Sequence, residues 1–183
     1  MTSNKTKVFI DGQHGTTGLQ ILDRLKDRPD IELLELPMAD RKDLGKRAEI
    51  AKSADIAVLC LPDAAAKELV AAMGNADTVV IDASTAHRVA PGWTYGFPEL
   101  CAGQAAEIAK ARRVANPGCY PTASLLALMP VVQAGLVAGT PVIDAKSGVS
   151  GAGRSKNTTD FLFSELDGGF KGYATTGHRH TPE

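Results

Sequence analysis

The sequence predicts an α/β protein whose first half is a doubly wound parallel sheet. Short apolar runs alternate with helical patterns along this half of the chain, and that alternation is typical of parallel sheets covered by helices on both faces. The apolar runs are continuous rather than interrupted by polar residues, as strands buried on both faces require. Right-handed crossovers then give the doubly wound arrangement.

Four strands and three helices are expected in this half. In the first helix Leu19, Leu22 and Leu25 lie on one face. The predicted strands cover residues 7–11, 31–36, 55–61 and 78–82. The predicted helices cover residues 17–26, 44–52 and 64–73.

After Ser84, glycine and proline interrupt the chain more often. The elements predicted there are helices over 102–111 and 122–129 and a strand over 141–145. Residues 155–183 have too little apolar periodicity to close a second core. At 183 residues the chain has room for one domain and part of another. We therefore expect a domain of residues 1–118, followed at 119–183 by the start of an α+β domain that stays incomplete.

The charge balance gives no reason to expect nucleic acid or an anionic membrane as a partner. Lys and Arg number 20 against 21 Asp and Glu, for a net charge of −1. No apolar run approaches the ~20 residues of a membrane span, and no secretory signal follows the N-terminus. We expect a cytoplasmic protein that binds small molecules and forms a homo-oligomer.

The three cysteines have no metal-type spacing, so we expect no metal site. Cys60 lies in an apolar run and is expected to be a buried, inert thiol, which is also the default for Cys101. Cys119 differs because a Pro-Gly pair precedes it and the helix predicted over 122–129 begins just after it. A helix N-terminus stabilises a thiolate, so Cys119 is the predicted nucleophile.

A glycine-rich loop follows the first predicted strand and opens the first predicted helix. Its G-x-x-G-x-x-G spacing is a variant of the dinucleotide-binding fingerprint of Rossmann-like folds. Small residues let the backbone approach a pyrophosphate, and the helix N-terminus supplies N–H groups. A structural turn is the alternative, but the flanking strand and helix favour a dinucleotide. The lining residues would be Gly12, Gly15, Thr16, Thr17 and Gly18.

Charged residues at the end of the second predicted strand and in the loop after it bear on the choice of cofactor. An acidic residue there, such as Glu35, would bind the ribose hydroxyls of NAD. Arg41 and Lys42 follow in the loop and suit the 2′-phosphate of NADP. A solvated loop pair is the alternative. We predict NADP.

A thiolate nucleophile needs a partner that handles protons. The densest polar cluster is His178-Arg179-His180, for which a solvated chain end is the alternative interpretation. His14, in the glycine loop, and His87, after the fourth predicted strand, are expected to be structural or to line the cofactor.

Together these motifs resemble the N-acetyl-gamma-glutamyl-phosphate reductases, relatives of the aspartate-semialdehyde dehydrogenases. The resemblance runs the whole length in motif order, and the segments around Cys119 and at 178–180 are specific to the reductases. The glycine loop has Gln-His where many members have Ala-Thr or Ala-Ser, which indicates the short subclass. The matching segments are 12–18, 61–62, 82–84, 95–99, 116–122, 146–154 and 178–183.

The resemblance implies reduction of an acyl phosphate to a semialdehyde by NADPH, with release of phosphate. Cys119 would form a thioester, and His178 would be the acid/base, with His180 as the runner-up. Asn116 would steady the developing oxyanion. The implied substrate contacts are Ser150, Arg154, Glu99 and His180, with Arg179 as a further anion-binding candidate. The implied cofactor contacts are Pro62, Ser84 and Gly151.

Family members continue beyond the residue that corresponds to Glu183. We therefore expect this chain to bind cofactor but to turn over acyl phosphate poorly, since His178 is the sixth residue counted back from Glu183.

Three other interpretations stay open. An aspartate-semialdehyde dehydrogenase performs the same chemistry, although residues 120–122 and 178–180 fit the reductases better. A cysteine hydrolase would have no use for a dinucleotide loop. A nucleotide-binding module without catalysis would bind NADP and form no thioester.

Overall fold

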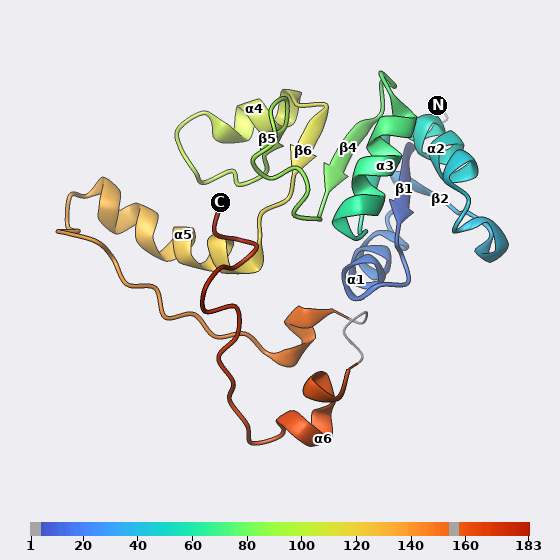
Figure 1. The fold of residues 1–183 in the computed structure, drawn as a ribbon. Coiled ribbons are helices and arrows are strands. Elements are labelled where there is room, and N and C mark those ends of the chain that lie inside the picture. The colour runs from blue at the N-terminus through green and yellow to red at the C-terminus, as the bar shows by residue number, and fades with distance from the viewer. Residues whose placement is uncertain (1–4, 154–157) are drawn as a thin grey trace. The chain divides into compact units, whose positions relative to one another are not determined.

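The structure, a computed structural model, describes residues 5–153 and 158–183. The chain divides into two compact units, which we call unit 1 (Met1–Pro117) and unit 2 (Gly118–Glu183) (Figure 1). Unit 1 contains the whole sheet, whereas the described residues of unit 2 form only helices and irregular segments.

Unit 1 is a six-stranded sheet in which all neighbouring strands are parallel. The strand order is β2-β1-β3-β4-β6-β5. The strands are β1 (Thr6–Asp11), β2 (Ile31–Leu34), β3 (Ile56–Leu59), β4 (Val79–Asp82), β5 (Thr94–Tyr95) and β6 (Arg113–Ala115). The helices are α1 (Thr16–Leu25), α2 (Leu44–Ser53), α3 (Asp63–Met73) and α4 (Gln104–Lys110), with a 3₁₀ turn, η1 (Met38–Asp40).

Helices cover both faces of this sheet, which confirms the predicted doubly wound α/β architecture. Val8 and Ile10 of β1 pack against the apolar side chains of α1. Phe9, between them, packs on the opposite face in a cluster that contains buried side chains of α2 and α3. Because successive side chains of a strand point to opposite faces, each face of the sheet acquires its own core.

The face of α1 that packs on the core differs in two residues from the predicted apolar face. Leu22 and Leu25 pack against the core as expected, and Ile21 packs beside them. Leu19 is 39% exposed and does not pack with them against the core.

The sheet also contains two strands that the pattern did not predict. β6 has three residues and β5 two, which is too short for a periodicity to show in the sequence. β6 pairs with β4 and β5 pairs with β6, so β5 forms one edge of the sheet. Along the chain, Ala115 is the last residue of the sheet.

The direction in which the sheet grows reverses between β1 and β3. The chain passes from β1 to β2 on one side and then returns to β3 on the other. In doubly wound sheets ligands bind outside the carboxyl ends of the strands at this switch point. Gly12 follows β1 and Cys60 follows β3, and a Cβ on Gly12 would lie 2.2 Å from the Cys60 carbonyl oxygen. Gly12 also has a φ of +82°, which only glycine adopts without cost.

Unit 2 begins with one long helix, α5 (Cys119–Gln133), which extends beyond both ends of the predicted 122–129. Its other elements are η2 (Val149–Ala152), η3 (Thr159–Phe161) and α6 (Phe163–Leu166). The strand predicted over 141–145 was wrong. Val142 is 94% exposed and Ile143 56%, and no strand in the described part of unit 2 supplies the hydrogen bonds that a strand needs.

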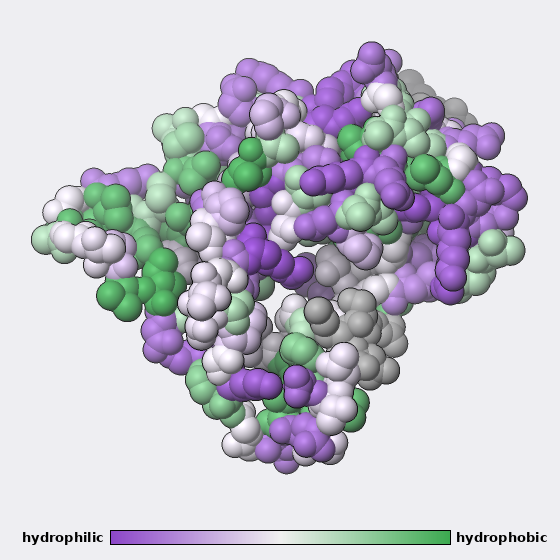
Figure 2. Space-filling model, in the orientation of Figure 1, coloured by the Kyte–Doolittle hydropathy of each residue, from purple (hydrophilic) through white to green (hydrophobic). Residues whose placement is uncertain are grey.

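Apolar side chains of unit 2 are largely exposed, and Figure 2 shows hydrophobic residues on the surface at the place of α5. No residue of α5 is buried, and every buried hydrophobic side chain of the described chain belongs to unit 1. Among the described residues, no helix is both long and apolar enough to cross a membrane. The exposed apolar residues of unit 2 include Leu126, Val131, Val132, Leu136, Phe163 and Phe170.

Candidate active site

The glycine loop joins β1 to α1 at the switch point. Gly15 is the N-cap of α1 and has an extended backbone, and no side chain caps this end of the helix. Thr16 and Thr17 begin the first turn, which contains no acidic residue. Its amide N–H groups and the helix dipole favour an anion here. A Cβ on Gly18 would lie 2.3 Å from the Gly12 carbonyl oxygen, so the tight loop needs glycine at both ends. This cradle fits the pyrophosphate of a dinucleotide.

A buried ion pair supports the start of this loop. Arg47 of α2 donates from Nε to the carboxylate of Asp11, the last residue of β1, at 2.8 Å, and both side chains are 9% exposed. Burial raises the pKa of Asp11, and the hydrogen bond and charge of Arg47 oppose that rise. Sequence reasoning missed this pair because the two residues lie 36 positions apart.

The cations predicted to select NADP lie just after η1, which follows β2. Arg41 and Lys42 are exposed, as is Glu35. In the part of the chain that the structure describes, the side chains of Arg41 and Lys42 form no hydrogen bond or ion pair. The neighbouring Lys46, by contrast, pairs with Asp40 at 2.6 Å. Both cations thus lie in the segment between η1 and α2.

A buried polar network occupies the carboxyl end of β4. The Ser84 hydroxyl donates to the Asp82 carboxylate at 2.7 Å, and His87 Nδ1 lies 2.6 Å from the same carboxylate. The His87 ring stacks on Trp93 with a centroid distance of 4.0 Å. These contacts give His87 a structural role, one of the two expected for it. Pro62, the other predicted contact on this side, is the N-cap of α3 and is exposed.

The backbone of Asn116 is held from two sides. Its N–H donates to the Asp82 carbonyl at 2.8 Å, and its carbonyl accepts from Arg88 Nε at 3.0 Å. The side chain is exposed and donates from Nδ2 to the Pro117 carbonyl at 3.1 Å. The amide predicted to steady an oxyanion is therefore engaged with its own chain in this structure.

The three cysteines occupy different environments. Burial raises the pKa of Cys60 to about 11, assisted by the negative charges of Asp11 and Asp82, which agrees with the inert thiol expected there. Cys101 is exposed, so the buried environment expected for it was wrong; it precedes α4 in a loop and its Sγ lies 3.9 Å from Gln104 Oε1.

Cys119 is the first residue of α5, with Gly118 as the N-cap. Its thiol is exposed and lines a cavity of about 510 Å³ together with Tyr120, Lys146 and Ser147. The sequence placed Cys119 at or just before a helix N-terminus, and the structure has it there. An exposed thiol at a helix N-terminus can act as a nucleophile.

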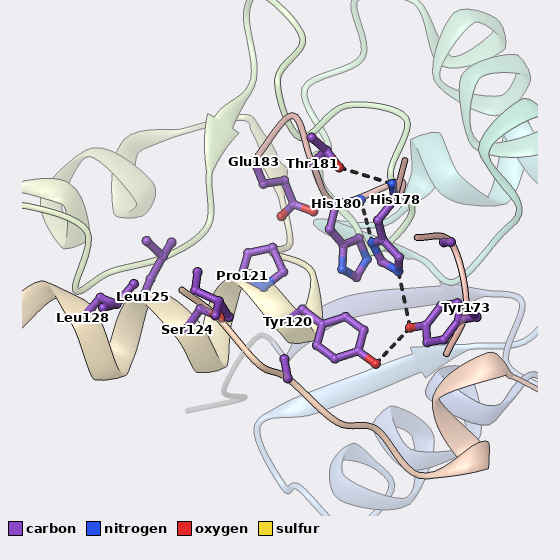
Figure 3. Close-up of a pocket in the computed structure, with 13 residues that line it drawn as sticks. Tyr120, Pro121, Ser124, Leu125, Leu128, Tyr173, His178, His180, Thr181 and Glu183 are labelled. Carbon is purple, nitrogen blue, oxygen red and sulfur yellow. Dashed lines mark hydrogen bonds between the residues drawn. The ribbon is translucent and has the colours of Figure 1, made fainter. Parts of the chain in front are cut away.

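The two predicted histidines lie together with two tyrosines in a second cavity, of about 620 Å³ (Figure 3). The Tyr173 hydroxyl donates to the Tyr120 hydroxyl at 2.9 Å, and His178 Nε2 lies 3.3 Å from the Tyr173 hydroxyl. His180 is buried, and its ring contacts those of Tyr120 and His178 edge to face at centroid distances of 6.0 and 4.7 Å. Sequence reasoning missed both tyrosines, although Tyr120 adjoins Cys119 in the chain.

Glu183 also belongs to this cavity. Its Oε2 accepts the N–H of Gly118 at 2.8 Å, so a carboxylate caps the N-terminus of α5. In the sequence, the only sign of a role for Glu183 is its position three residues after His180. In the described part of the chain, no group of three or more His, Cys, Asp or Glu could hold a metal ion.

Four other predicted residues that the structure describes line neither cavity. Ser150 and Gly151 lie in η2, Glu99 lies in unit 1, and all three are exposed, as is Arg179. Arg154, predicted to bind a substrate anion, lies outside the described residues.

Two protein-family models match the chain. Residues 7–110 match the model described as "Semialdehyde dehydrogenase, NAD binding domain". Residues 119–183 match "Semialdehyde dehydrogenase, dimerisation domain". The first match supports the expected nicotinamide dinucleotide in unit 1 without distinguishing NADP from NAD.

Curated relatives match nearly the whole chain. A protein of Chelativorans sp. is 53% identical over 180 residues, covering 97% of this chain and 58% of the relative. Relatives from Burkholderia cenocepacia and Mesorhizobium japonicum are 52% and 50% identical, covering 96% and 98% of this chain and 58% and 59% of the relatives. All three are named N-acetyl-gamma-glutamyl-phosphate reductase. The chain thus spans less than two thirds of their length.

Solved structures show the same fold at low sequence identity. Aspartate semialdehyde dehydrogenase II from Vibrio cholerae is 20% identical with a TM-score of 0.60, covering 84% of this chain and 49% of that one. The aspartate semialdehyde dehydrogenase from Francisella tularensis is 19% identical with a TM-score of 0.55, covering 71% of this chain and 41% of that one. With a family model matched over more than half of its residues and close relatives along its length, the chain belongs to the semialdehyde dehydrogenase family.

Proposed function

We propose that this chain is the cofactor-binding and nucleophile-bearing part of an N-acetyl-gamma-glutamyl-phosphate reductase. The reaction would convert N-acetyl-glutamyl 5-phosphate to N-acetyl-glutamate 5-semialdehyde, in arginine biosynthesis. Residues 1–118 would bind the cofactor, and 119–183 would begin the catalytic domain. The names of the relatives support this substrate, and the matched dimerisation domain supports a homo-oligomer. We further propose that it acts in the cytoplasm.

One observation carries the proposal. An exposed cysteine, Cys119, is the first residue of a 15-residue helix, in a chain whose other unit has a glycine cradle at the switch point of a parallel sheet. A nucleophilic thiol and a dinucleotide site in one chain suit reduction through a thioester, since a thioester is both easily formed from an acyl phosphate and open to hydride.

We propose NADP as the cofactor. Arg41 and Lys42, which form no side-chain interaction among the described residues, would receive the 2′-phosphate, while the glycine cradle would hold the pyrophosphate. NADPH would supply the hydride that reduces the thioester.

The protein's own part of the reaction is acyl transfer. The Cys119 thiolate attacks the acyl carbon, the S–C bond forms, the C–O bond to phosphate breaks and phosphate leaves. After reduction the C–S bond breaks and the semialdehyde is released. A histidine, His178 or His180, would handle the proton of the thiol. The other residues proposed from the resemblance are Asn116, Ser150, Arg154 and Glu99 toward the substrate, and Pro62, Ser84 and Gly151 toward the cofactor.

Substrate choice tests this proposal. The chain is mixed with N-acetyl-glutamyl 5-phosphate or with aspartyl 4-phosphate, and covalent adducts are read by intact mass. We expect an N-acetyl-glutamyl adduct that hydroxylamine removes, as it removes thioesters. An adduct from aspartyl phosphate alone would instead assign an aspartate-semialdehyde dehydrogenase activity.

A second candidate function is cofactor binding without turnover. The absence of any buried hydrophobic side chain in the described part of unit 2 favours it, because a catalytic site needs packed support to hold its geometry. NADPH binding with no adduct from either acyl phosphate would support this candidate.

A further inference from the structure

Hydrogen bonds join His178, Tyr173 and Tyr120 into one chain within unit 2, and the direction of these bonds can be assigned. The backbone N–H of His180 donates to His178 Nδ1 at 3.1 Å. A nitrogen that accepts an N–H carries no proton, so the neutral imidazole of His178 has its proton on Nε2. Nε2–H therefore donates to the Tyr173 hydroxyl, 3.3 Å away.

The same direction continues to Tyr120. The Tyr173 hydroxyl donates to the Tyr120 hydroxyl at 2.9 Å (Figure 3). Desolvation, followed by the hydrogen bond that it donates to Tyr120, raises the pKa of Tyr173 to about 12. Tyr173 therefore keeps its proton at neutral pH and remains a donor. Each hydrogen bond in such a chain polarises the next.

Tyr120 is the last member of this chain of donors. The bond to Tyr173 is one that its hydroxyl accepts, so its own proton is left to donate. Tyr120 also lines both cavities, the one that contains Cys119 and the one that contains the histidines. It follows Cys119 directly in α5. The available proton thus belongs to one of the four residues that line both cavities, and to the one that adjoins Cys119 in the chain.

We propose that Tyr120 is a catalytic residue whose hydroxyl donates a hydrogen bond to the acyl oxygen of the substrate. This inference rests on the proposed function. As the S–C bond to Cys119 forms, the carbonyl electron pair moves onto the acyl oxygen; it returns as phosphate leaves. Tyr120 stabilises that oxyanion without giving up its proton. Tyr173 and His178 are positioning residues that orient and polarise the Tyr120 hydroxyl.

This assignment also changes the part expected of His178. With Nδ1 engaged by a backbone N–H, its neutral form acts as a donor and not as a base. Neutral histidine serves as an electrophilic hydrogen-bond donor in other enzymes.

Two electrophiles that react with the same thiol test the proposal. Acylation by N-acetyl-glutamyl 5-phosphate passes through an oxyanion, whereas alkylation by iodoacetamide does not. Removing the hydroxyl in Tyr120→Phe should slow acylation of Cys119 about 100-fold, as loss of one oxyanion-hole donor does. Alkylation of Cys119 should keep its wild-type rate. Tyr95→Phe, which removes a hydroxyl from unit 1, is the matched control and should leave both rates unchanged.

The outcomes separate this inference from the proposed function. Equal acylation of wild type and Tyr120→Phe would overturn the role of Tyr120 and leave the proposed function standing. Parallel loss of acylation and alkylation would also overturn it, because the thiol itself would then have changed. Absence of any wild-type adduct would overturn the proposed function and this inference with it.

A separate measurement tests the direction of the hydrogen bonds from His178 to Tyr173 and Tyr120. Nitrogen-15 NMR of the labelled chain should show His178 protonated on Nε2 only, and Tyr173→Phe should shift that Nε2 signal and slow acylation less than Tyr120→Phe does. A proton on Nδ1 of His178 would reverse the direction of the chain and overturn the proposal whatever the acylation rates are.

Discussion

The helices α3 and α5 show how differently the two units use apolar sequence. α3 buries Ala66, Leu69 and Met73 against the sheet. α5 is longer, with 15 residues against 11, and buries none. In unit 1 the helices α1, α2 and α3 each bring apolar side chains to the sheet, whereas the described part of unit 2 has no sheet for α5 to cover. Apolar sequence makes a core only where an opposing face is present.

The buried ion pair offers the largest expected effect in this comparison. Asp11→Asn leaves the guanidinium of Arg47 buried without its carboxylate, and should lower the free energy of unfolding by about 3–5 kcal/mol. Urea unfolding followed by circular dichroism measures it. Asp23→Asn is the control, since it breaks an exposed pair with Lys26 and should leave the unfolding midpoint unchanged. Similar midpoints for the two variants would show that Asp11 does not hold the loop.

One substitution made in both units tests the contrast of their packing. Leu69 is 0% exposed and Leu126 49%. Leu69→Ala should lower the free energy of unfolding by about 2–5 kcal/mol, and Leu126→Ala should change it by less than about 0.5 kcal/mol. Denaturant titration of both variants decides the matter. A loss at Leu126 as large as that at Leu69 would mean that α5 has a buried face after all.

Cofactor selection should depend on unit 1 alone. Arg41→Ala should weaken NADPH binding about tenfold, the equivalent of one charge-assisted hydrogen bond, and should leave NADH binding unchanged. Fluorescence titration with both cofactors measures this. Lys46→Ala is the matched control, because Lys46 already pairs with Asp40. Equal affinities of the wild type for NADPH and NADH would contradict the choice of NADP.

The thiols should differ in the pH at which they react. Because burial raises the pKa of Cys60 to about 11, only about one thiol in a thousand there is ionised at about pH 8. Iodoacetamide should label the exposed Cys101 and Cys119 first and reach Cys60 only as the pH approaches its pKa. Peptide mass mapping across a pH series follows the three sites. Labelling of Cys60 as fast as Cys101 would show that it is not shielded.

The sequence predicted most of unit 1 because strand and helix there are short, adjacent and periodic. The helix predicted over 44–52, for example, is α2, Leu44–Ser53. It failed at β5 and β6, which are too short to have a period, and at 141–145, where a β-type run has no strand beside it in the described part of unit 2. The local pattern of a sequence shows which residues are apolar, but it does not show whether a neighbouring strand is present to pair with them.

The site was predictable only where its residues are marked by local sequence signals. Cys119 could be placed because a helix N-terminus and a Pro-Gly pair are local signals. The bonds between Asp11 and Arg47 and between Tyr120 and Tyr173 join residues 36 and 53 positions apart, and nothing in a single sequence indicates that those side chains meet.

A single-turnover experiment tests most directly the claim that the two units together perform a reduction through Cys119. The chain is acylated with N-acetyl-glutamyl 5-phosphate, freed of excess reagent and mixed with NADPH, while nicotinamide absorbance and intact mass are followed. We predict that one NADPH is oxidised for each thioester lost, that the semialdehyde appears, and that Cys119→Ser shows neither event although it binds NADPH normally. Loss of the thioester as free acid without NADPH oxidation, or an adduct that persists on Cys119→Ser, would contradict the account.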